Sequence, residues 1–74
     1  MKRHADEYRS RGITTEDVAR LIDLYIFRER DRGIMRRKLI DGLTFEEVAD
    51  EFGMSPRGIK YIVYRGEAII FKHV

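Results

Sequence analysis

Two helix starts with a glycine between them lie within residues 44–62, and this arrangement constrains the fold more than any other feature of the chain. Thr44 and Ser55 can each cap a helix, because a hydroxyl oxygen accepts a hydrogen bond from an unpaired amide of the first turn. Glu47, three residues after Thr44, completes a capping box. Pro56 follows Ser55 at the first helical position, where its missing N–H costs nothing. Gly53 stands where the chain must leave one helix and turn sharply, which favours a residue that tolerates positive φ.

This pair of helices matches the helix-turn-helix unit, in which a short turn that often contains glycine joins two steeply crossing helices. Ala49 is the one small residue on the inner face of the first helix, where crossing backbones need space. A plain helical hairpin would share the caps and the apolar spacing, so the joint placement of Ala49 and Gly53 favours the helix-turn-helix. The second helix of such a unit commonly enters the major groove of DNA. The other inner positions are apolar: Val48, Phe52, Met54, Ile59 and Ile62.

The N-terminal half of the chain predicts two further helices. An apolar stripe with helical spacing begins after Thr14 or Thr15 and consists of Val18, Leu21, Ile22 and Tyr25. The stripe loses its phase at Glu29, which indicates a break near residues 27–28; a single long helix through this region is the alternative. Leu24 and Ile26 lie off the stripe and indicate either broad burial or a partner surface.

The expected fold is therefore all-α, a small bundle of about four helices. Gly42 ends the second helix as its C′ residue. Gly66 permits close helix approach in the last helix, and alanine there could regain helix propensity. The expected helices cover residues 15–27, 29–41, 44–52 and 56–72.

The composition predicts one domain that relies on helix packing alone. The chain has 74 residues and no cysteine, so disulfide staples are absent. His4 and His73 lie near opposite ends without a second ligand at useful spacing, so we expect no metal site and no cofactor. No apolar run approaches the length of a membrane span, which favours a cytoplasmic protein. Residues 1–12 are polar and basic and are expected to form a flexible arm or a frayed helix before the domain at 13–74.

The net charge of +2 is a weak argument for nucleic acid, but the charge is unevenly distributed. Residues 1–40 hold eleven Lys or Arg against seven Asp or Glu, residues 41–53 hold none against five, and residues 54–74 hold four against one. The acidic block is the first helix of the predicted pair, so Glu46, Asp50 and Glu51 should face away from phosphates. A solvated helical face explains the same residues without any partner.

The outward face of the last helix mixes cations with phenols, a combination suited to DNA. Arg and Lys can bind guanine edges or phosphates, and Tyr can donate to a phosphate or pack on a thymine methyl group. A solvated face that happens to be basic is the alternative. We expect base readout from Arg57, Lys60 and Tyr61. We expect phosphate contacts from Arg36, Arg37, Lys38, Thr44, Ser55, Tyr64 and Arg65.

From residue 29 to about residue 71 the chain resembles region four of bacterial RNA polymerase sigma factors, the module that reads the upstream promoter element. The matching segments are residues 29–36 (ERDRGIMR), 41–49 (DGLTFEEVA), 51–55 (EFGMS) and 59–62 (IKYI). The resemblance implies contact with double-stranded DNA and a possible contact with RNA polymerase. Gly58 and Tyr61 stand where the family has longer polar readers, and Arg37 stands where it often has an apolar residue, so its base preference does not carry over. At this length we expect a lone module, as in small phage and prophage regulators.

The leading hypothesis is a sequence-specific DNA-binding transcription regulator. No paired His and carboxylate, Gly-rich phosphate loop or activated nucleophile suggests an enzyme. The alternative is a protein-interaction module of the same fold that docks on RNA polymerase or another protein, with weak or no DNA binding. Tyr61, Tyr64 and the modest net charge keep this alternative open.

Overall fold

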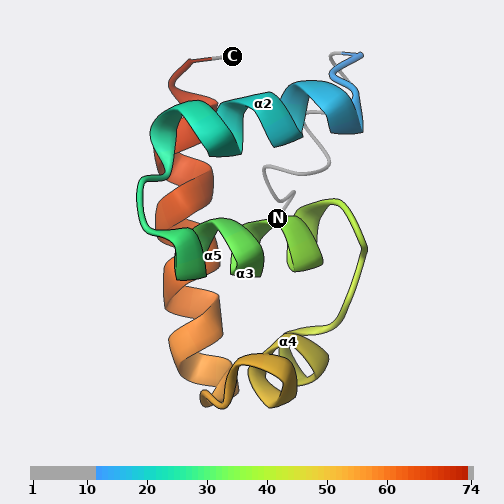
Figure 1. Cartoon of the computed structure of the whole chain (residues 1–74). Coiled ribbons are helices and arrows are strands. Elements are labelled where there is room, and N and C mark those ends of the chain that lie inside the picture. Colours follow the sequence, from blue (N-terminus) through green and yellow to red (C-terminus); the bar gives the residue numbers. More distant parts are fainter. Residues whose placement is uncertain (1–11, 74) are drawn as a thin grey trace.

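The computed structural model describes residues 12–73, which form four helices and no strand. The predicted all-α bundle is confirmed. Most of the predicted arm at residues 1–12, including His4, lies outside the described residues. The helices, drawn in Figure 1, are α2 (Thr15–Tyr25), α3 (Glu29–Leu39), α4 (Phe45–Phe52) and α5 (Pro56–Phe71).

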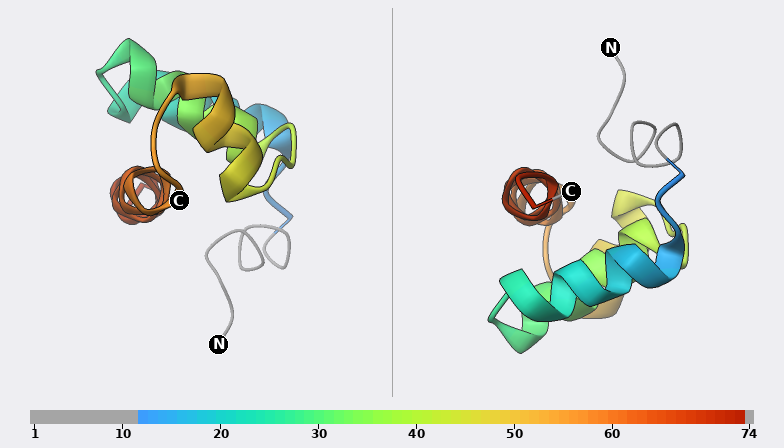
Figure 2. Two further views of the ribbon diagram at one scale, coloured as in Figure 1. Left: turned by 90° about the horizontal axis from the view of Figure 1, so that it is seen from below. Right: turned by 90° about the horizontal axis from the view of Figure 1, so that it is seen from above.

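The longest helix, α5, packs against each of the other three. In Figure 1, α2, α3 and α4 follow one another along its length. Figure 2 shows α5 end-on, with α2 and α3 lying to one side of it. Of the helices within residues 12–73, none has the length and apolar character needed to cross a membrane. The largest fully buried side chains come from all four helices: Ile22, Ile34, Met35, Val48, Ile59, Val63 and Ile70.

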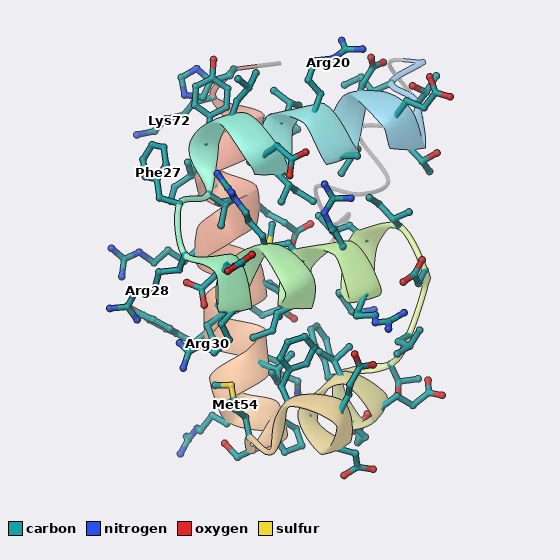
Figure 3. The ribbon with its side chains drawn as sticks, in the orientation of Figure 1. Arg20, Phe27, Arg28, Arg30, Met54 and Lys72 are labelled. Atoms are coloured by element: carbon teal, nitrogen blue, oxygen red, sulfur yellow. The ribbon has the colours of Figure 1, made fainter. Side chains whose placement is uncertain are left out.

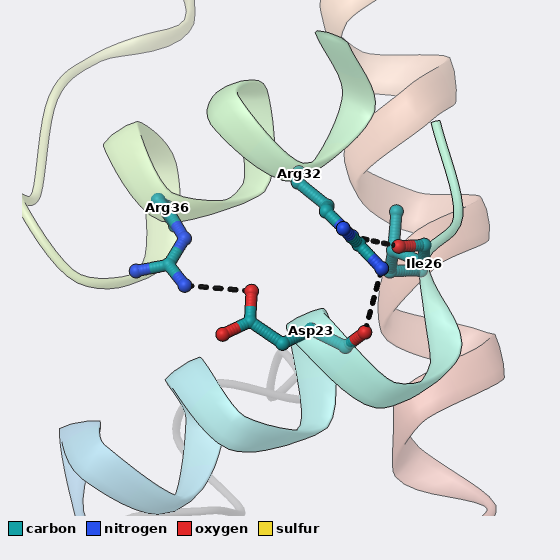
Figure 4. A network of polar contacts seen from close by, with 4 residues as sticks. All are labelled: Asp23, Ile26, Arg32 and Arg36. Carbon is teal, nitrogen blue, oxygen red and sulfur yellow. Dashed lines mark hydrogen bonds and ion pairs between the residues drawn. The ribbon is translucent and has the colours of Figure 1, made fainter. Parts of the chain in front are cut away.

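The predicted break between the first two helices is present, and the alternative of one continuous helix is wrong. The helix α2 ends at Tyr25, two residues earlier than predicted, and Ile26 and Arg28 are extended. Arg32 holds the connection: its Nε donates to the carbonyl of Ile26, and its Nη2 donates to the carbonyl of Asp23 at 2.7 Å (Figure 4). Arg28 makes no side-chain cap bond, so this break lacks the local signal that marks the other helix starts.

The helix α3 also ends two residues before its predicted limit. The amides of Ile40 and Asp41 both donate to the carbonyl of Arg36, at 2.9 and 3.1 Å. Gly42 then adopts a φ of 77°, a conformation that favours glycine. The glycine therefore makes the turn, but it lies one residue beyond the C′ position that we predicted for it.

At Gly66, α5 approaches α3 closely. A Cβ atom at Gly66 would lie 2.5 Å from Sδ and 2.6 Å from Cε of Met35, which is itself fully buried. The predicted close approach is confirmed. The added methyl group would have to displace the end of the Met35 side chain, and this packing cost opposes the gain in helix propensity expected from the sequence.

Candidate nucleic-acid interface

The corner between α4 and α5 has the local geometry that the sequence predicts. The Thr44 hydroxyl accepts from the Glu47 amide at 3.1 Å, and the Glu47 carboxylate accepts from the Thr44 amide at 2.9 Å. Both bonds lower the pKa of the Glu47 carboxyl group, and the bond from the Thr44 backbone contributes more than the bond with its side chain. The Ser55 hydroxyl accepts from the Gly58 amide at 3.2 Å, which caps α5.

Gly53 turns the chain from one helix to the next. Its φ of 64° and ψ of 35° are left-handed, as predicted, and its amide donates to the carbonyl of Ala49. The Met54 amide donates to the same carbonyl at 2.9 Å. Ala49 is 2% exposed, in keeping with a small residue at a helix crossing. The start of α5 is thus held at a fixed position relative to α4.

The predicted base readers all lie on the exposed face of α5. Arg57 and Lys60 are exposed, and Tyr61 is 64% exposed. Arg65 lies one turn beyond Tyr61, and its Nη1 donates to the Tyr61 hydroxyl at 3.3 Å. The only acid in α5 is Glu67, which is buried. The exposed face of α5 therefore presents cations and phenols without a carboxylate.

Two of the predicted phosphate contacts already have carboxylate partners. Arg36 pairs with Asp23 at 2.7 Å (Figure 4). Arg37 lies between Asp41 and Glu51, at 3.0 Å from each, and these two carboxylates raise its pKa. The pairs are about half exposed, so each contributes little to stability. A phosphate would still have to replace a carboxylate at either arginine.

The remaining predicted phosphate contacts fall into three groups. The hydroxyls of Thr44 and Ser55 serve as helix caps, and each keeps a proton that it can donate. Lys38 and Tyr64 lie on the same side of the molecule as Lys60, because all three side chains lie close to the ring of Phe45. Arg65 lies on the other flank of α5.

A groove of about 660 Å³ runs along that other flank, between α5 and the connection from α2 to α3. Phe27 is 81% exposed at its edge. Figure 3 shows Phe27, Arg28 and Arg30 projecting from one side of the molecule. Of the two residues for which the sequence left broad burial or a partner surface open, Ile26 is buried and Leu24 is 55% exposed.

Among residues 12–73, no group of three or more His, Cys, Asp or Glu side chains is placed to hold a metal ion. His73 instead stacks on Tyr25, with 3.6 Å between ring centroids. No family model, curated protein or solved structure matches this chain. The resemblance to sigma region four therefore rests on the residues quoted for it.

Proposed function

We propose that the protein is a sequence-specific DNA-binding transcription regulator in which α4 and α5 form a helix-turn-helix. One observation carries the proposal: the exposed face of α5 bears three cations and two phenols and no carboxylate, directly after a rigid, capped corner. In helix-turn-helix complexes, the N-terminal residues of the recognition helix are the ones that contact base edges. The resemblance to sigma region four adds RNA polymerase as a second partner, in a bacterial cytoplasm.

In this proposal the N-terminal turns of α5 enter the major groove. Arg57 lies in the first turn and can reach the O6 and N7 atoms of guanine. Tyr61 is steadied by its hydrogen bond with Arg65 and offers a hydroxyl and a ring edge to a base. Gly58 has no side chain, so the base pair opposite it should be loosely specified. A Cβ atom there would lie 3.3 Å from Cε of Met54, which explains how α5 packs closely against the corner.

The acidic face of α4 supports the same orientation. Glu46, Asp50 and Glu51 are exposed, and Glu51 binds Arg37 on α3. With α5 in the groove, these acids have to point away from the phosphate chains, because a carboxylate beside a phosphate is repelled. Arg36 and Arg37 contact a phosphate only after giving up their carboxylate partners. They therefore contribute less to DNA affinity than cations without such partners.

The test is selection from a random duplex library, followed by titration of the selected site and a scrambled duplex at several salt concentrations. We expect one enriched sequence, bound more tightly than the scramble. The logarithm of the binding constant should fall steeply and linearly with the logarithm of salt. No enrichment, together with binding that does not respond to salt, would overturn the proposal.

A second function is favoured by one specific observation, the groove beside Phe27. Phe27 is 81% exposed next to apolar walls, and an aromatic side chain of this kind can anchor a protein partner. Under this alternative the chain docks on RNA polymerase or another protein. Phe27→Ala then abolishes that association, whereas Arg57→Ala leaves it unchanged. Unchanged association in Phe27→Ala would remove this alternative.

A further inference from the structure

Three helices place two lysines on one aromatic ring. Nζ of Lys38, from α3, lies 4.7 Å from the ring centroid of Phe45, the first residue of α4. Nζ of Lys60, from α5, lies 5.5 Å from the same centroid. The ring of Tyr64 meets the Phe45 ring edge-on, at 5.8 Å and 79°. The attraction of ammonium groups to the aromatic ring explains why both lysines lie close to it.

The two ammonium groups repel each other. Their nitrogens are at most about 10 Å apart, the sum of their distances from the shared centroid, and like charges at that separation repel. Within residues 12–73, no carboxylate pairs with either lysine, whereas Arg36 and Arg37 on the same α3 are both paired. Glu47, the capping acid of α4, accepts from the Thr44 amide.

The N-terminus of α4 adds to the positive potential at this point. Phe45 is the first residue of a helix of eight residues, where amides carry a partial positive charge. Glu46 follows it and opposes this effect in part, but its side chain is exposed and pairs with neither lysine. Two unpaired ammonium groups from different helices, held on one ring beside a helix N-terminus, are suited to a single anion with several oxygens.

We infer that Lys38 and Lys60 together bind one backbone phosphate of DNA, with the Phe45 ring holding them in place. This inference rests on the proposed function and changes one assignment within it. Lys60 was predicted to read a base, but its ammonium group is drawn to the flank of α5 that faces α4. Base readout then falls to Arg57 and Tyr61, and Lys60 contributes affinity that is the same for every sequence.

Sharing a phosphate has a measurable signature in salt dependence. Each phosphate neutralised contributes a slope of about 0.9 to the plot of log binding constant against log salt. If both lysines bind one phosphate, each single variant should keep most of the slope, because the other lysine still neutralises that phosphate, and the double variant Lys38→Ala/Lys60→Ala should lose about 0.9. Two separate phosphates would give a loss of about 1.8. Each single variant should weaken the selected and scrambled duplexes by the same factor.

Lys72→Ala is the matched control. Lys72 is an exposed lysine at the far end of α5, opposite the corner at Met54 (Figure 3), and its loss should change neither affinity nor slope by a comparable amount. Phe45→Leu removes the ring while keeping an apolar side chain, and should lower affinity for both duplexes; a circular-dichroism melt establishes that it folds. A smaller specific-to-scrambled ratio in Lys60→Ala would overturn the inference, as would a slope loss near 1.8 in the double variant.

A failure of the inference can be separated from a failure of the proposed function. If the wild type binds duplex DNA and the lysine variants match the Lys72 control, only the shared phosphate site is wrong. If the wild type binds no duplex, the proposed function fails, and NMR titration with inorganic phosphate then decides the site. Shifts of the Lys38, Lys60 and Phe45 side-chain signals, with Lys72 unmoved, would support an anion site there. No such shifts would overturn it.

Discussion

The α4–α5 corner and the α2–α3 connection are both sharp changes of direction, but they are built in different ways. At the corner, Thr44, Gly53 and Ser55 each act on residues within a few positions of themselves. At the connection, Arg28 provides no side-chain cap, and the backbone is held by Arg32, which donates to carbonyls six and nine residues earlier. The corner is thus fixed by local chemistry, and the connection by a side chain from the following helix.

This difference matters for function as well as for folding. The corner fixes the position at which α5 begins. Because the exposed face of α5 is the proposed DNA reader, the corner also determines how this helix enters a groove. The connection carries Phe27 and Arg28 at the edge of the groove that the alternative function would use. Variants of each region separate the two kinds of support.

The largest effect is expected at the corner, from Gly53→Val. The φ of 64° is strained for a β-branched residue, and we expect a loss of about 2 to 3 kcal/mol in the free energy of unfolding. A Cβ atom at Gly53 would meet nothing within 4 Å, so the cost is conformational and does not come from crowding. Gly53→Asn, which tolerates left-handed backbone, should lose much less. Equal urea midpoints for the two variants would contradict this account of the corner.

A smaller effect is expected at the connection, from Arg32→Ala. Two hydrogen bonds from a charged donor are lost, but Arg32 is partly exposed. We therefore expect the free energy of unfolding, measured in urea, to fall by about 1 to 2 kcal/mol. Arg32→Lys should recover little, because a single ammonium group cannot reproduce the geometry of two guanidinium donors. If Arg32→Lys were as stable as the wild type, the connection would not depend on the arginine fork.

The next effect concerns the packing of α5 on α3. We expect Gly66→Ala to lose about 1 kcal/mol in the free energy of unfolding, measured in urea. Gly66→Ala regains about 1 kcal/mol of helix propensity but introduces a methyl group against Met35, at an overpacking cost of about 2 kcal/mol. The double variant Gly66→Ala/Met35→Ala should be less destabilised than the two single losses added together, because the smaller side chain makes room. Additive losses would show that Met35 does not limit the approach.

The smallest effect is a pH dependence at the corner. The pKa of Glu47 is lowered from its ordinary value of 4.5 by its bonds with Thr44, so the folded state holds its proton less tightly than the unfolded state. Its contribution to stability is therefore complete above that value and is lost as pH falls through the lower, folded pKa. Glu47→Gln should flatten the fall in melting temperature between about pH 5 and pH 3. An unchanged profile would contradict the capping box as its source.

The sequence was a good guide to the corner because its signals are local. Caps, a proline at the first helical position and a glycine in the turn all act within one helical turn of themselves, and each was found where predicted. The support of the α2–α3 connection was missed because Arg32 looks like any surface cation until the fold brings it to Ile26 and Asp23.

The candidate site was predicted only in part, for the same reason. Helical spacing correctly placed Arg57, Lys60 and Tyr61 on the exposed side of α5. It could not show that Lys60 points to the Phe45 ring on α4, or that Arg37 is held by Asp41 and Glu51. Those contacts depend on how the helices pack, which no spacing within one helix reveals.

The central claim is that the exposed face of α5 reads DNA sequence, and Arg57→Ala tests it most directly. Affinity for the selected site and for a scrambled duplex is measured at two salt concentrations, with Arg20→Ala as the control. Arg20 is an exposed arginine on α2, so its variant loses the same charge away from the proposed interface (Figure 3). Losing a base contact costs about 1 to 3 kcal/mol on the preferred site and little elsewhere. We therefore expect Arg57→Ala to reduce the specific-to-scrambled ratio about tenfold, with no change in Arg20→Ala. Equal ratios in the wild type and Arg57→Ala would contradict the claim.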